Sequence, residues 1–238
     1  MKIGWCYTQL EGTTAFPSPS KFHLPKDPSP TKRGHFSCPA VRATTEGCFV
    51  IKSPFSLRLR YEQKTNVGTF VPIYPFTSIT DHKLSEWFRP EPTNTWRSFD
   101  IPIFQFPSPY IFVADEQIEI ELIHPFISDI SSLNWRLIPG RFNIYGWQRP
   151  LNWAAEWDAR CGDLIIKLGD PLYYIRFYDD QKRIISHPDL VKIKFTDEIK
   201  ERVQGAAGVT SFRRGTQALI REESESRNQN LIVPLKNE

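Results

Sequence analysis

The sequence predicts a mainly β fold, a single antiparallel β-sandwich or barrel domain of jelly-roll type. Segments in which apolar and polar residues alternate recur along the chain, and turn residues separate them about every 8–12 residues. The 20 prolines argue against a helical bundle, because proline breaks helix interiors. Of the 238 residues, 40% are hydrophobic and 24% are charged, which is typical of a folded globular domain.

Three regions are expected along the chain. Residues 1–47 hold a short strand at 3–7 and a proline-rich arm at 12–39, because closely spaced prolines favour extended backbone over helix. The phenylalanines of the arm are expected to anchor it, and packing on its own domain is favoured over packing on a neighbouring subunit. Residues 48–195 form the sandwich or barrel core. Residues 196–238 form a short helical extension with a polar tail.

The first half of the core begins with the apolar residues 48–51. In residues 55–61, polar residues that include Arg58 and Arg60 then alternate with apolar side chains. That alternation indicates a half-buried strand with a basic outer face. Prolines interrupt a later apolar segment, which indicates edge strands and bends. The expected elements are strands at 48–51 and 55–61, a helix at 80–88 capped by Thr80 or Asp81, and edge strands within 101–113.

Turn signals divide the second half of the core into short strands, the clearest being Pro139-Gly140 and Gly169-Asp170-Pro171. The first of these strands carries glutamates on its outer face. The expected strands are residues 118–122, 133–138, 142–147, 152–158, 164–166 and 172–178.

Beyond the core the pattern becomes helical. Residues 197–204 are expected to form a helix with Thr196 as its cap and acidic residues in its first turn. Gly205 and Gly208 are expected to interrupt it, and residues 209–223 are expected to form a second helix.

The charge balance argues against some classes of partner. Thirty basic and 27 acidic residues give a net charge of +3, which is too weak to indicate nucleic acid or an anionic membrane. The sequence has no apolar run of about 18 residues and no signal-peptide pattern after Lys2. We therefore expect a cytoplasmic protein without a membrane partner.

The four cysteines are expected to be free thiols, mostly buried, because disulfides are rare in a cytoplasm. Three soft ligands, His35, Cys38 and Cys48, lie close in sequence. Structural zinc usually needs four ligands, and no second close pair exists, since Cys161 and His187 lie far apart in the sequence. No metal and no cofactor is therefore expected.

Patterns typical of catalysis are missing from the sequence. It has no Gly-x-Ser-x-Gly elbow, no glycine-rich nucleotide loop and no iron-oxygenase ligand set. Asp158, Asp163 and Asp170 lie near turns, where carboxylates that cap the backbone are commoner than paired acids for glycoside cleavage. No catalytic residue is therefore identified.

The aromatic residues concentrate in one part of the chain, where four of the seven tryptophans are interleaved with arginines. The favoured interpretation is a core strand on which Trp153, Ala155 and Trp157 share the inward face. The alternative is a concave wall that binds a planar or sugar-like ligand, or single-stranded nucleic acid. The candidate residues for binding a ligand or partner are Trp135, Arg136, Arg141, Tyr145, Trp147 and Arg149.

Several short motifs follow one another in the sequence. They are Ser37-Cys38-Pro39-Ala40, Gly47-Cys48-Phe49-Val50-Ile51-x-Ser53-Pro54, Pro107-Ser108-Pro109-Tyr110-Ile111-Phe112, Leu151-Asn152-Trp153 and Gly169-Asp170-Pro171-Leu172. In these motifs, across residues 37–178, the chain resembles a family of uncharacterised proteins found in bacteria and in tailed phages, especially contractile-tailed phages of cyanobacteria. Cys48 departs from that pattern, in which an aromatic residue follows the glycine. The resemblance implies a phage or bacterial origin and a compact β domain, and it implies no catalytic residue.

The expected function is therefore binding or structural, through a protein partner or through self-association. A phage-encoded chain of this kind would act in the host cytoplasm or in the virion. Two alternatives stay open. One is an enzyme with an unfamiliar site in the mouth of a β-barrel near residues 133–163, which would take a small-molecule ligand. The other is a host-takeover factor that binds a host protein.

Overall fold

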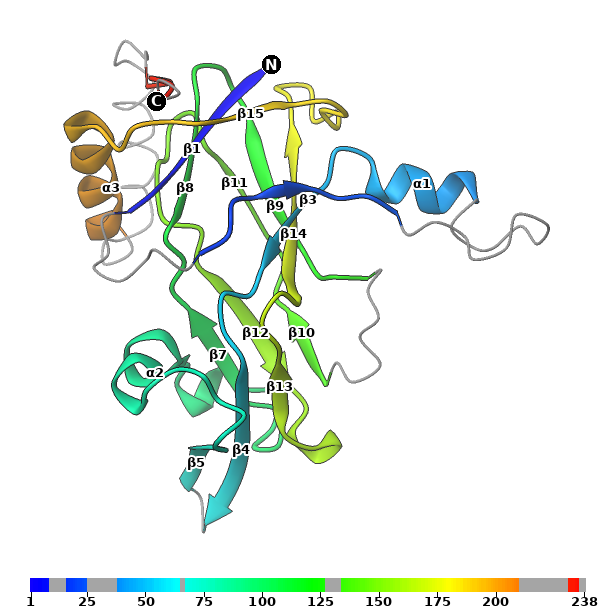
Figure 1. Ribbon diagram of the computed structural model, residues 1–238, viewed down its shortest axis with the longest axis vertical. Coiled ribbons are helices and arrows are strands. Elements are labelled where there is room, and N and C mark those ends of the chain that lie inside the picture. Colours follow the sequence, from blue (N-terminus) through cyan, green and yellow to red (C-terminus); the bar gives the residue numbers. More distant parts are fainter. Residues whose placement is uncertain (9–15, 25–37, 65–66, 127–133, 210–230, 236–238) are drawn as a thin grey trace.

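The computed structural model describes residues 1–8, 16–24, 38–64, 67–126, 134–209 and 231–235. The protein is mainly β, with 39% of residues in strands and 17% in helices, so the predicted fold class is confirmed at this level. The described strands form four open sheets, and none of these closes into a barrel. The molecule is elongated, with β4 and β5 at one end and β1 and β15 at the other (Figure 1).

The largest sheet has the strand order β11-β9-β14-β3-β2, and every neighbouring pair in it is antiparallel. Its core face carries buried apolar side chains such as Ile120 and Phe177. Its outer face carries Glu119 and Glu121, which confirms the acidic face expected for this segment. The strands are β11 (Gly140–Asn143), β9 (Glu119–Ile123), β14 (Pro171–Tyr178), β3 (Phe49–Lys52) and β2 (Ser20–Lys21).

A four-stranded antiparallel sheet holds the tryptophan-rich strand, in the order β10-β12-β7-β6. Trp153 and Trp157 are 3% and 0% exposed and Ala155 is fully buried, which confirms that this face points inward. Proline in the 101–113 segment was expected to mark edge strands. The strand Tyr110–Ala114 does lie at the edge of its sheet. β7 instead lies between β12 and β6, because its flanking prolines fall outside the paired residues. The strands are β10 (Trp135–Leu137), β12 (Trp153–Trp157), β7 (Ile103–Phe106) and β6 (Arg89–Pro90).

Two three-stranded sheets complete the described β structure. In the sheet β13-β4-β5, Leu57 and Leu59 are buried while Arg58 and Arg60 lie on the outer face, as the alternation predicts. In the sheet β15-β1-β8, the β1–β15 pair is parallel, whereas the other described strand pairs are antiparallel. The strands are β13 (Leu164–Ile166), β4 (Leu57–Lys64), β5 (Val67–Pro72), β15 (Asp189–Lys192), β1 (Lys2–Tyr7) and β8 (Tyr110–Ala114).

The helices agree in part with expectation. Helix α2 (Asp81–Trp87) begins at Thr80, whose hydroxyl accepts a hydrogen bond from the Lys83 N–H at 3.3 Å, so Thr80 is the cap. Helix α3 (Asp197–Val209) begins after Thr196, whose hydroxyl accepts the Ile199 N–H at 3.3 Å. It continues through Gly205 and Gly208, so the expected interruption is wrong. The second helix, expected over 209–223, lies almost wholly outside the described residues.

Helix α1 (Pro39–Thr45) lies in the region 1–47, where only a strand and an extended arm were expected, so that expectation was incomplete. Pro39 is the first helical residue, a position where its missing N–H costs nothing because that group has no partner within the helix. Two short 3-10 helices, Thr93–Thr95 and Ala159–Cys161, also lie in segments expected to be irregular or extended. Among the described helices, none is both long and apolar enough to cross a membrane.

The core has two parts. The larger cluster joins buried side chains of all four sheets, including Ile3, Leu57, Ile120 and Trp157. A smaller cluster lies between α3 and the β15-β1-β8 sheet, where Ile199 of α3 packs with Ile111 and Val113 (Figure 1). The main core therefore lies where the sheets meet, and the aromatic pocket described below lies in it.

Candidate functional site

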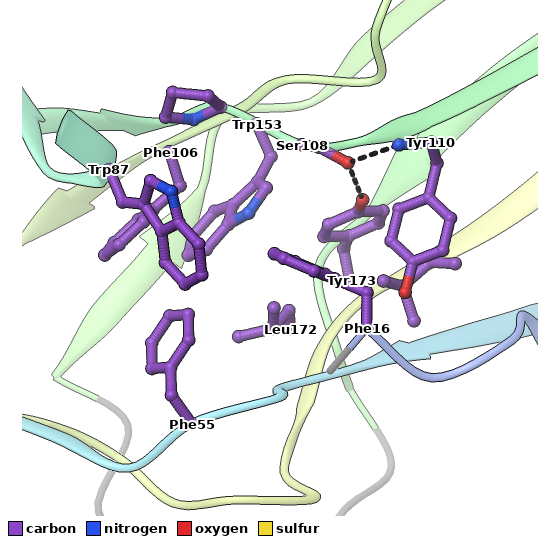
Figure 2. A pocket seen from close by; sticks show the side chains of 11 residues that line it. Phe16, Phe55, Trp87, Phe106, Ser108, Tyr110, Trp153, Leu172 and Tyr173 are labelled. Atoms are coloured by element: carbon purple, nitrogen blue, oxygen red, sulfur yellow. Dashed lines mark hydrogen bonds between the residues drawn. The ribbon is translucent and has the colours of Figure 1, made fainter. Parts of the chain in front are cut away.

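An aromatic pocket lies at the junction of the sheets, and segments far apart in the sequence line it (Figure 2). Trp153 and Phe106 come from neighbouring strands, Trp87 from α2 and Tyr173 from the largest sheet. The remaining lining residues are Phe16, Ile51, Phe55, Pro107, Ser108, Tyr110 and Leu172.

Three of the lining residues of this pocket carry a hydroxyl: Ser108, Tyr110 and Tyr173. The Ser108 Oγ lies 3.3 Å from the Tyr173 OH and accepts the Tyr110 N–H at 3.4 Å (Figure 2). Burial raises the pKa of Tyr110 and of Tyr173 well above the ordinary value of a phenol. Both tyrosines are therefore neutral near pH 7, so they can donate hydrogen bonds but cannot act as bases.

Phe16 of the N-terminal region closes one side of the pocket. Its ring lies 5.4 Å from the Trp87 ring and 6.0 Å from the Tyr110 ring, between centroids. The Tyr7 OH donates to the Phe16 carbonyl oxygen at 2.7 Å, and the Tyr110 OH donates to the Pro17 carbonyl oxygen. Two buried or half-buried tyrosines thus hold residues 16 and 17 against the core of their own chain.

The pocket is nearly filled by the protein itself. Its empty volume is about 290 Å³ with the space at its mouth included, but only about 10 Å³ of this can hold the centre of a water molecule. A cavity of that size holds about one water. A substrate-sized ligand would need Phe16 or another ring to move.

Trp135 and Arg136, two of the six residues predicted to bind a ligand or partner, lie on β10. Trp135 is 2% exposed and packs against His124 and Trp153, with ring centroids 5.5 and 5.6 Å away. The prediction that Trp135 belongs to an exposed binding wall is therefore wrong, and Trp135 is a core residue. Arg136 is exposed on the opposite face of β10.

Arg141 lies on another sheet, on the outer face of β11. It donates from Nε to the Glu119 Oε2 at 2.6 Å, and its guanidinium carbon lies 3.7 Å from the centre of the Tyr178 ring. Glu119 also pairs with Lys182. Burial would raise the pKa of Glu119, but Lys182 and Arg141 outweigh this and hold it below the ordinary value. Arg141 thus already has a carboxylate partner within the protein.

Tyr145, Trp147 and Arg149 are brought together, in a loop and not in the strand expected over 142–147. The strand ends at Asn143, because its side-chain oxygen accepts the N–H groups of Tyr145 and Gly146 at 2.7 and 3.3 Å and turns the chain. The three side chains are half-buried. This loop, residues 145–149, is the part of the predicted site that the structure gathers in one place.

The soft-ligand triple does not form a described site. His35 lies outside the described residues. Cys48 is buried and its Sγ lies 3.8 Å from the Thr44 carbonyl oxygen, whereas Cys38 is exposed. Burial raises the pKa of Cys48, which disfavours the thiolate that metals bind. Within the described parts of the chain, no group of three or more His, Cys, Asp or Glu side chains is placed to hold a metal ion.

The three turn acids have structural roles. Asp158 accepts the Arg160 N–H and pairs with its guanidinium, and Asp170 accepts the Lys167 N–H at 2.9 Å. Asp163 accepts hydrogen bonds from Arg58 and Arg60 at 2.7 and 3.1 Å. Asp158 and Asp170 therefore serve local structure, as expected for acids at turns, whereas Asp163 binds two arginine side chains that are distant in the sequence.

None of the pocket residues is among the six predicted site residues, because nothing local in the sequence connects the segments that line the pocket. The motif segments do converge there: Ser108, Trp153 and Leu172 all line the pocket, and the Asn152 Oδ1 accepts the Ser108 N–H at 2.9 Å. These motifs were interpreted as turn and packing residues, and in the structure they form the junction of the sheets. Comparison of the chain with protein-family models, with the sequences of curated proteins and with solved structures finds no match.

Proposed function

We propose that the protein acts by binding a protein partner or a second copy of itself, and not by catalysis. The observation that carries this proposal is the state of the aromatic pocket, which its own side chains fill down to room for about one water. Its titratable groups are tyrosines held neutral by burial. A rigid scaffold with surface loops is a common basis for binding.

We also propose the finer architecture, a β-sandwich of jelly-roll type with the N-terminal arm packed on it and a helical C-terminal extension. Support comes from the contact between the two largest sheets, where Trp153 of one lies 6.1 Å from Tyr173 of the other between ring centroids. Two contacts support the proposal that the arm packs on the core. β2 pairs with β3, and the ring of Phe22 lies 4.7 Å from that of Tyr174.

The resemblance to a phage family supports an origin in a phage and a role either in the virion or in the host cytoplasm. The test is to fractionate particles and host extract from a culture that produces the chain, and to locate it by mass spectrometry, while the purified chain is sedimented alone. We expect it in particles, in a complex with a host protein or in a self-assembled form. Recovery only as a free 27.7 kDa monomer in every fraction would contradict the proposal.

Recovery in particles would identify a virion component, and recovery with a host protein would identify a host-takeover factor. The enzyme alternative gains no support from the described residues of 133–163. Trp135 and Trp157 are buried there, and Asp158 and Asp163 are engaged with arginines.

A further inference from the structure

The surroundings of Arg149 differ from those of the other arginines that are at least half-buried in the described chain. Its guanidinium carbon lies 4.7 Å from the centre of the Trp147 ring and 5.5 Å from that of Phe142. Arg58, Arg176 and Arg202 are each ion-paired with a carboxylate within 3.1 Å, whereas Arg149 has no such partner among the described residues.

Burial lowers the pKa of Arg149 below its ordinary value, and no neighbouring charge among the described residues offsets this effect. Arginine stays charged near pH 7 even so. The faces of Trp147 and Phe142 replace part of the hydration that the guanidinium has lost, because the face of an aromatic ring attracts a cation. A half-desolvated cation of this kind gains more from an arriving anion than a fully solvated one does.

A second donor group of the loop, the Trp147 indole N–H, also lacks an acceptor among the described residues. The Trp147 Nε1 that carries this hydrogen is buried. The loop itself is braced, because the buried Gln148 side chain donates to the carbonyl oxygens of Ile144 and Tyr145 at 3.0 and 2.7 Å. A guanidinium, an indole and a phenol are thus presented on a fixed backbone, and Arg, Trp and Tyr are the residue types that dominate binding energy at protein interfaces.

We propose that the 145–149 loop is a docking surface for an acidic segment of a protein partner, with a carboxylate of the partner binding the Arg149 guanidinium and an adjoining apolar side chain packing on Trp147 and Tyr145. This inference depends on the proposed binding function and specifies its chemistry. A carboxylate fits the planar guanidinium with two parallel hydrogen bonds. Phosphate backbones of nucleic acids are bound by several cations together, and Arg149 has no second cation beside it among the described residues.

The test uses the full chain, labelled with ¹⁵N, and two probe peptides, acetyl-Leu-Glu-Leu-amide and acetyl-Leu-Gln-Leu-amide. The signals followed are the Arg149 Nε–H and the Trp147 indole N–H. We expect both signals to shift saturably with the Glu peptide and the Gln peptide to bind at least tenfold more weakly. Equal shifts with both peptides, or no saturable shift, would overturn the inference, and this comparison needs no variant.

Arg149→Gln should abolish the response. The matched control is Arg42→Gln, which removes an exposed arginine on α1 that likewise has no ion pair among the described residues and should leave the response intact. A response that survives Arg149→Gln would also overturn the inference. If fractionation finds a complex but the Glu peptide has no effect, the inference fails and the binding function stands. If the peptide binds but no complex exists, the binding function fails and the loop remains a carboxylate site.

Discussion

The indole ring of Trp153 lies flat against the ring of Phe106, with centroids 4.9 Å apart and 15° between the ring planes. The two residues are register partners on β12 and β7, so the sheet itself sets this stack. Both rings line the aromatic pocket and belong to the main core.

Replacing Trp153 with alanine should therefore lower the free energy of unfolding. Loss of a buried tryptophan ring costs about 3–5 kcal/mol, through lost burial and the cavity left behind. At this chain length 1 kcal/mol lowers the Tm by about 2–4 °C, so a drop of at least about 6 °C is expected in thermal melting. Trp157→Ala should behave alike. If both variants melt within a degree or two of the parent, the core assignment fails.

Asp163→Asn should destabilise the protein at neutral pH and not in acid. Burial would raise the pKa of Asp163, but hydrogen bonds and charge from Arg60 and Arg58 outweigh it and hold the pKa below its usual range. Because the folded pKa is depressed, the stabilisation is present above the unfolded value of about 3.9 and is lost as pH falls through the folded pKa. The partner arginines are partly exposed, so the loss at pH 7 is about 1 kcal/mol.

Urea denaturation at pH 7 and at successively lower pH measures this difference between parent and variant. Asp180→Asn is the matched control, since Asp180 is exposed and has no ion pair in the described structure. If the free energies of unfolding of the parent and of Asp163→Asn differ by the same amount down to pH 2, the ion pairs do not stabilise the fold.

The four cysteines should fall into two classes of reactivity. Cys38 and Cys161 are exposed, whereas Cys6 and Cys48 are buried, so the expectation that most of them are buried is wrong for two. Burial raises the pKa of Cys6 to about 12, and the thiolate is the reactive form. Labelling with Ellman's reagent at pH 8 should therefore modify Cys38 and Cys161 in the native chain, and all four in denaturant. Mass mapping that finds Cys6 labelled as fast as Cys161 would contradict this.

Gly47→Ala should destabilise the protein more than Gly169→Ala does. Both glycines have positive φ, +67° and +87°, which costs an L residue about 1–2 kcal/mol. At Gly47 a Cβ would also lie 2.6 Å from the backbone oxygen of Ile185, whereas at Gly169 nothing lies within 4 Å. The free energies of unfolding of the two variants, measured by denaturant titration, should differ by at least about 1 kcal/mol, because overpacking at Gly47 adds that much. Equal losses would show that the Ile185 backbone yields.

Local patterns account for what could be predicted. The alternation of Leu57 and Leu59 with Arg58 and Arg60 specified a strand with one buried face, since successive side chains point to opposite faces. Thr80 and Thr196 marked helix starts, because their hydroxyls satisfy N–H groups that have no partner within a helix.

The sequence by itself thus determined the β class, the inward face of Trp153 and Trp157, and the helix starts, because these depend on residues a few positions apart. The tertiary structure alone decided which segments meet. Phe16, Trp87 and Tyr173 reach one pocket from three distant segments, and the six candidate residues divide among β10, β11 and the 145–149 loop. The division follows from Asn143, whose side chain ends β11 by binding two backbone N–H groups, so Trp147 and Arg149 leave the sheet and stack on each other. Contacts between distant segments depend on how whole sheets pack, and no spacing within one segment encodes that.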